Sequence, residues 1–149
     1  MKNQLFDLTK KVSLITGGNG GIGLGMAKGL ASCGSDIAII GRNVEKNLKA
    51  KEELAQFDVR VETYSIDVSN EKDVRETISN VVNDFGRIDT VFANAGMNLF
   101  GGSFEDMDTE GYRKVLAVNL DGVFFTLRES CKHMVETVSY THQTLPTKA

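Results

Sequence analysis

Short aliphatic runs alternate along the chain with longer segments whose apolar residues recur every three or four positions. The runs are rich in Val and Ile, which are typical of strands. Four strands are predicted, at residues 12–16, 36–40, 59–63 and 88–93. The first run is apolar enough to be buried, whereas the third alternates apolar and polar positions and indicates a half-exposed strand.

The segments between and after these runs predict four helices. They cover residues 22–31, 43–56, 69–85 and 109–131. Asn43 is a suitable N-cap for the second helix. Val44, Leu48 and Leu54 are then expected on its inner side. In the third helix the apolar residues share one face, and Gly86 is a good helix stop.

Strands that alternate with helices of this length predict an α/β fold. The expected architecture is a Rossmann-like, doubly wound parallel sheet covered on both faces, with strand order 3-2-1-4. Such a sheet normally continues, so this one is truncated after the fourth strand and the following long helix. Gly122 lies inside that helix, where glycine lowers stability, and it predicts a close backbone approach.

Composition narrows the class of protein. The 149 residues suit one domain, and 41% hydrophobic with 25% charged residues is an ordinary soluble mixture. A formal net charge of −3 gives no reason to expect nucleic-acid or membrane partners. The first eleven residues show no signal-peptide pattern. We therefore expect a cytoplasmic protein whose two cysteines, Cys33 and Cys131, are reduced.

Nine of the fifteen glycines lie between Gly17 and Gly41. The turn after the first strand contains Gly-x-Gly-x-x-Gly from Gly18 to Gly23, between a strand and a helix, which is the context that the motif requires. Glycines allow the backbone to approach a pyrophosphate, and the helix N-terminus favours its charge. The alternative is a flexible glycine turn that binds no ligand.

Four motifs in the same order and spacing resemble the short-chain dehydrogenase/reductase family. They are Thr16-Gly17-x-x-x-Gly21-Ile22-Gly23, Asp67-Val68, Asn94-Ala95-Gly96 and Val118-Asn119. The resemblance covers roughly residues 6 to 136, which correspond to the N-terminal half of a typical member.

The resemblance implies a role for each matching residue. Gly17, Gly21, Ile22 and Gly23, with Asn19 in the same turn, would surround the pyrophosphate and the nicotinamide side of a dinucleotide. Asp67 would accept a hydrogen bond from the adenine amine, beside the Val68 backbone. Asn94, Ala95 and Gly96 would pack against the ribose and tie strands together. Asn119 would be the asparagine of the catalytic tetrad. Asn94 and Asn119 could also simply satisfy backbone groups.

The second strand ends in Gly41-Arg42-Asn43, without the acidic residue that usually binds the ribose hydroxyls of NAD. The planar cation of Arg42 suits a 2′-phosphate and can stack on adenine. The sequence therefore favours NADP(H) over NAD(H). The alternative for Arg42 is an exposed surface charge.

The family's other catalytic groups are a Ser and a Tyr-x-x-x-Lys pair, in which the Lys helps the Tyr to act as an acid or base. Tyr64, Tyr112 and Tyr140 are not followed by Lys four positions later. We therefore expect this chain to be catalytically incomplete. Its parent would move a hydride between nicotinamide and a carbonyl or secondary alcohol, with a sugar or sugar acid as the suggested substrate.

The last residues do not follow the family pattern. We expect residues 1–137 to be the dinucleotide-binding part of one domain. Residues 138–149 are Thr-rich, contain the only proline, and show no strand or helix period. They are expected to be a non-native tail, and the alternative is a genuine disordered terminus.

No metal site is predicted, because the spacing of Cys131, His133 and His142 matches no standard zinc pattern. The expected partner of the parent is a small-molecule carbonyl or alcohol, and the parent is expected to form a homo-oligomer. The leading hypothesis is thus a fragment of an NAD(P)(H)-dependent oxidoreductase. A noncatalytic NADP-binding or regulatory module is the alternative, and a chain unable to fold alone is the third.

Overall fold

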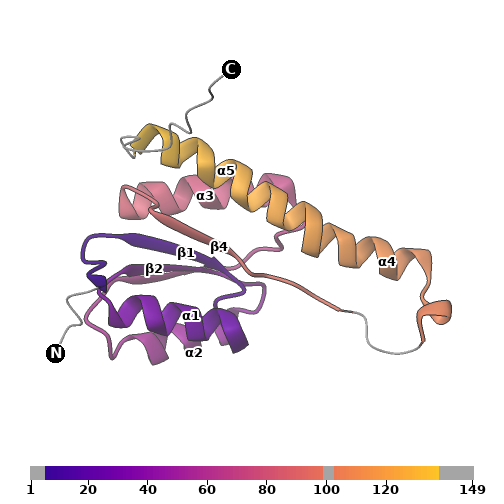
Figure 1. The fold of residues 1–149 in the computed structure, drawn as a ribbon, viewed down its shortest axis with the longest axis horizontal. Helices are drawn as coiled ribbons and strands as arrows, with labels where there is room; N and C mark the ends of the chain where they lie inside the picture. The colour runs from indigo at the N-terminus through magenta and orange to yellow at the C-terminus, as the bar shows by residue number, and fades with distance from the viewer. Residues whose placement is uncertain (1–5, 99–102, 138–149) are drawn as a thin grey trace, which may run out of the picture.

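Four parallel strands form the sheet of the computed structural model, which describes residues 6–98 and 103–137 (Figure 1). The strands are β1 (Val12–Thr16), β2 (Asp36–Ile40), β3 (Val61–Tyr64) and β4 (Thr90–Ala93). They lie in the order β3-β2-β1-β4, which confirms the predicted order. The predicted tail, residues 138–149, lies outside the described residues.

Helices cover both faces of this sheet (Figure 1). Their bounds are α1 Gly21–Ser32, α2 Val44–Leu54, α3 Glu71–Phe85, α4 Thr109–Leu116 and α5 Gly122–Thr137. On one face lie α1 and α2, and on the other lie α3 and α5. A short 3₁₀ turn, η2 (Phe104–Asp106), precedes α4.

The core has two halves because successive strand residues point to opposite faces of the sheet. Leu14 and Ile40 belong to the half that α3 covers, together with Ile78. Ile15 and Ile39 belong to the half under α1 and α2. All five side chains are at most 1% exposed. The alternating strand pattern thus fixes which residues meet each helical layer.

The predicted inner side of α2 is wrong for two residues. Leu54 is fully buried, but Val44 and Leu48 are 57% and 53% exposed. The buried face is formed instead by Asn47, Ala50 and Leu54. Ala50 allows close packing against the sheet, and Asn47 is buried because its amide is hydrogen-bonded.

The last predicted helix is interrupted. A π-helical turn, η3 (Ala117–Asp121), separates α4 from α5, and the helical course continues to Thr137. The close approach predicted at Gly122 is confirmed. A Cβ atom there would lie 2.8 Å from Val68 Cγ2 and 3.2 Å from the Val68 carbonyl oxygen.

Gly122→Ala should therefore destabilise the fold, although alanine is the better helix former. Val68 is buried and β-branched, so it cannot yield cheaply, and overpacking costs about 1–3 kcal/mol. Gly29→Ala in α1 is the matched control, because a Cβ atom there meets nothing within 4 Å. This second change should stabilise by up to about 1 kcal/mol. Urea unfolding measures the change in the free energy of unfolding for both variants. If both changes have the same sign, the close packing at Gly122 is contradicted.

Candidate functional site

The glycine turn joins β1 to α1 at the carboxyl edge of the sheet. Gly17 and Gly21 adopt φ values of 67° and 49°, in the left-handed region that favours glycine. The N-cap of α1 is Gly20, and no side chain caps the helix. The first-turn N–H groups of α1 are therefore available to an anion.

Asn94, directly after β4, braces this turn. Its Nδ2 donates to the carbonyl oxygens of Thr16, at 3.0 Å, and Gly17, at 3.4 Å. The Ala95 N–H donates to Thr16 Oγ1 at 2.9 Å. A Cβ atom at Gly23 would collide with the Gly17 carbonyl oxygen and with Asn94 Nδ2. The brace thus requires glycine at position 23.

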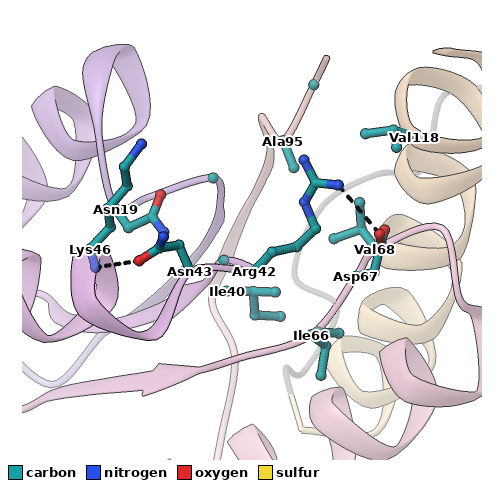
Figure 2. Close-up of a pocket in the computed structure, with 13 residues that line it drawn as sticks. Asn19, Ile40, Arg42, Asn43, Lys46, Ile66, Asp67, Val68, Ala95 and Val118 are labelled. Carbon is teal, nitrogen blue, oxygen red and sulfur yellow. Dashed lines mark hydrogen bonds and ion pairs between the residues drawn. The ribbon is translucent and has the colours of Figure 1, made fainter. Parts of the chain in front are cut away.

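An open pocket of about 290 Å³ lies beside the turn, at the carboxyl ends of the strands (Figure 2). Its lining residues come from the glycine turn, the ends of β2 and β3, the start of α2, the segment after β4 and η3. They are Gly17, Asn19, Ile40, Gly41, Arg42, Asn43, Lys46, Ile66, Asp67, Val68, Ala95, Gly96 and Val118. The strand order reverses at β1, and the carboxyl edge at such a point is the usual ligand crevice of an open α/β sheet.

The structure brings seven of the predicted site residues together in this lining: Gly17, Asn19, Arg42, Asp67, Val68, Ala95 and Gly96. The other five do not line it. Gly21 and Ile22 are exposed at the start of α1, and Gly23 is buried beneath the turn. Asn94 supports the turn, and Asn119 lies in η3.

Arg42 reaches across the pocket to Asp67 (Figure 2), and the Nη1 to Oδ2 distance is 3.5 Å. Both side chains are partly exposed, so this ion pair adds little to stability. Burial raises the pKa of Asp67. Hydrogen bonds from the Ser69 N–H and hydroxyl, together with the charge of Arg42, lower this pKa by more than burial raises it. The net pKa lies below the ordinary value, which keeps the carboxylate ionised.

Asn119 pairs with the segment that follows β4. Its Oδ1 accepts from the Met97 N–H at 2.8 Å, and its Nδ2 donates to the Met97 carbonyl at 2.9 Å. The side chain thus satisfies both backbone groups of one residue, as a neighbouring strand would. It holds this segment against η3, close to Gly96, where a Cβ atom would lie 3.5 Å from Asn119 Oδ1.

Sequence reasoning missed several pocket residues. Lys46 and Asn43 both line the pocket from the start of α2. Asn47 lies beneath it, 1% exposed, and accepts a 2.6 Å hydrogen bond from Asn19 Nδ2. One signal was available: Asn43 and Asn47 are four residues apart and so lie on the same side of the helix. It was missed because Asn47 falls among charged residues that are typical of a solvated helix.

The candidate metal ligands lie far from this pocket in the sequence, on α5 and beyond. Within residues 6–98 and 103–137, no group of three or more His, Cys, Asp or Glu side chains is arranged to hold a metal ion. His142 lies outside these ranges. No helix in the same part of the chain is both long and apolar enough to cross a membrane.

A family model described as short chain dehydrogenase matches residues 11–139. The chain therefore belongs to the short-chain dehydrogenase family, as its four motifs suggested. Sorbose reductase of Schizosaccharomyces pombe is 36% identical over 131 residues, covering 87% of this chain and 51% of the relative. A probable NADP-dependent mannitol dehydrogenase of Yarrowia lipolytica is 36% identical over 121 residues, covering 80% and 44%.

Solved structures agree with this assignment. NAD⁺-bound xylitol dehydrogenase superposes with a TM-score of 0.84 and 35% identity, covering 87% of this chain and 50% of that one. The chain thus spans about half the length of the curated relatives it matches. The predicted family and fold class are confirmed.

Ser69→Ala should raise the pKa of Asp67, because it removes the side-chain hydrogen bond to Oδ1. A carboxyl group with a lowered folded-state pKa stabilises the fold above its unfolded pKa, and this stabilisation is lost as the pH falls through the folded value. The variant should therefore lose less stability on acidification. NMR titration of the Asp67 carboxyl carbon measures the pKa.

The control is Ser79→Ala, which removes an exposed hydroxyl on α3 that donates to the Arg75 carbonyl. It should leave the Asp67 pKa unchanged. An unchanged pKa in Ser69→Ala would show that the Ser69 hydroxyl does not stabilise the carboxylate.

Proposed function

We propose that this chain is the cofactor-binding part of an NAD(P)(H)-dependent oxidoreductase that acts on a carbonyl or secondary alcohol. The observation that carries the proposal is the pocket beside the glycine turn, which gathers residues from four separate motifs. Gly21, Ile22 and Gly23 would hold the pyrophosphate through first-turn N–H groups of α1 that no side chain caps. Gly17, whose N–H donates to the Ile40 carbonyl, and Asn19 would complete the turn around it.

The adenosine end of the cofactor would lie at the carboxyl ends of β2 and β3. Asp67 is ionised and lines the pocket, so it can accept from the adenine amine beside Val68. Asn94, Ala95 and Gly96 would bound the ribose on the β4 side. Bound nicotinamide would supply or accept the hydride.

NADP(H) is the proposed cofactor in preference to NAD(H). Arg42 and Lys46 both line the pocket, and no acidic side chain stands at the end of β2. A 2′-phosphate would meet two cations there, whereas ribose hydroxyls would lack their usual carboxylate. Names that specify NADP and a structure that contains NAD⁺ both occur among the relatives, so the preference rests on this chain's own charges.

The proposed substrate class is a sugar or sugar acid, and the names of the relatives add polyols to it. Several relatives are named for polyhydroxylated compounds, among them sorbose, mannitol, gluconate and xylitol. Others are named for a 2,4-dienoyl-CoA and an (R)-specific alcohol activity. Asn119 would be the one tetrad residue present. Its amide is paired with Met97, so its proposed contribution is to hold the segment after β4 in place beside the reacting groups.

The alternative proposal is a noncatalytic NADP-binding module, favoured by the absence of Tyr-x-x-x-Lys from the 149 residues.

The main proposal has three further parts: a domain boundary at residue 137, a homo-oligomeric parent and a cytoplasmic location. The family match, which ends at residue 139, supports the boundary. In the proposed location Cys33 and Cys131 would stay reduced.

Binding of NADPH tests the proposed function. NADPH should raise the melting temperature of the chain more than NADH does, because a ligand that binds only the folded state stabilises it by mass action. Arg42→Ala should weaken NADPH binding about 10- to 100-fold, the value of a charge-assisted hydrogen bond, and leave NADH binding nearly unchanged. Calorimetric titration measures both affinities.

Arg75→Ala is the matched control, since it removes an exposed arginine on α3 that pairs with Glu71. It should change neither affinity. If neither cofactor binds the unaltered chain, the proposed function is wrong. If Arg42→Ala and Arg75→Ala behave alike, NADP preference must come from another residue.

The purified chain should not oxidise or reduce sorbose, mannitol or xylitol, even at saturating NADPH or NADP⁺. The reason is chemical: none of its three tyrosines has a lysine four positions later to assist proton transfer. The nicotinamide absorbance measures turnover, with a full-length sorbose reductase as the positive control. Sustained turnover by the chain would contradict the proposed catalytic incompleteness.

A further inference from the structure

Asn47 is a buried polar residue for which the proposed function gives no role. It lies on the inner face of α2 and is 1% exposed. Its Nδ2 donates to the Gly41 carbonyl at 2.9 Å and to Ser65 Oγ at 2.9 Å, with the Tyr64 carbonyl at 3.4 Å. One side chain therefore joins α2 to the ends of β2 and β3, directly beneath the pocket.

These partners determine which way the Asn47 amide faces. Backbone carbonyls only accept, so the nitrogen of Asn47 must face Gly41 and Tyr64. Its Oδ1 is then turned toward the glycine turn, where it meets Asn19 Nδ2 at 2.6 Å. Since Oδ1 only accepts, Asn19 must present its nitrogen to it.

The orientation of Asn19 follows from this contact. Asn19 lines the pocket (Figure 2), and its Oδ1 has no hydrogen-bond partner among the described residues. Both amides also pack closely over Gly41, where a Cβ atom would collide with Asn19 Nδ2 and lie 2.7 Å from Asn47 Oδ1, so this contact requires glycine at position 41. The pocket thus presents a fixed acceptor at Asn19, while the cations lie at Arg42 and Lys46.

We propose that Asn47 is a positioning residue that orients Asn19 so that Asn19 Oδ1 accepts a hydrogen bond from a ribose hydroxyl of the bound dinucleotide. An acceptor oxygen suits a hydroxyl group, which can donate a proton to it. It repels a phosphate, which has lost its protons at a pH above about 6. The 3′-hydroxyl of the adenosine ribose is common to NADPH and NADH. Asn47 therefore sets affinity for both cofactors, and Arg42 sets the preference between them. The inference rests on the proposed dinucleotide site.

The test is calorimetric titration of the 149-residue chain with NADPH and with NADH. Asn47→Leu should weaken binding of both cofactors about 3- to 10-fold, the value of one hydrogen bond to a neutral group. The ratio of the two affinities should stay within about twofold of that of the unaltered chain. Asn19→Ala, which removes only a partly exposed side chain, should have the same effect.

The double variant distinguishes positioning from independent action. If Asn47 acts through Asn19, the double variant should bind no more weakly than the weaker single variant. Independent effects would multiply to about 10- to 100-fold. In NMR spectra the side-chain amide resonances of Asn19 should shift in Asn47→Leu, because its nitrogen loses its acceptor.

Leu54→Ala is the control for simple destabilisation, since Leu54 is fully buried on the same face of α2 but outside the pocket. Leu54→Ala should lower the melting temperature. At temperatures where the variant is still folded, its affinities for NADPH and NADH should be unchanged. Unaltered affinities in Asn19→Ala, or multiplying effects in the double variant, would overturn the inference while leaving the proposed function intact. Failure of the unaltered chain to bind either cofactor would overturn both.

Discussion

The brace between the carboxyl ends of β1 and β4 is the contact on which the pocket depends. Asn94 Nδ2 holds the carbonyls of Thr16 and Gly17, and Thr16 Oγ1 accepts the Ala95 N–H. These bonds satisfy backbone groups at the end of the ladder, whose last paired residues are Thr16 and Ala93. Because α1 starts directly after this turn, the same contacts fix the position of its uncapped N-terminus.

Polar side chains of two kinds complete the pocket. Asparagine amides hold backbone segments in place: Asn47 at the ends of β2 and β3, and Asn119 at the segment after β4. Charged groups line the open side, where Arg42 and Asp67 face each other across it. The amides are hydrogen-bonded to fixed carbonyls, whereas the ion pair is partly exposed and weak. The walls are thus rigid, and the groups that would recognise a ligand remain free to exchange partners.

Strands β1 and β2 were predicted with their observed bounds, because their Val and Ile runs are flanked by turns. The glycine turn was also predicted from the sequence, because only glycines, which lack a Cβ atom, allow such a tight turn. Asn47 was missed because burial of an amide depends on acceptors from β2 and β3 that are distant in sequence. The π-helical turn η3 was missed because a shift in helical hydrogen bonding leaves no mark on apolar spacing.

The sheet order also has a kinetic consequence. Neighbours in β1–β2 and β2–β3 pair residues 24 positions apart, as in Val12 with Asp36 and Ile37 with Val61. Strand β4 joins β1 only across 77 positions, as in Ser13 with Thr90. Closing this longer loop costs about 1 kcal/mol more chain entropy. Loop entropy alone therefore favours pairing of β1, β2 and β3 before β4 docks, and docking of β4 would complete the pocket.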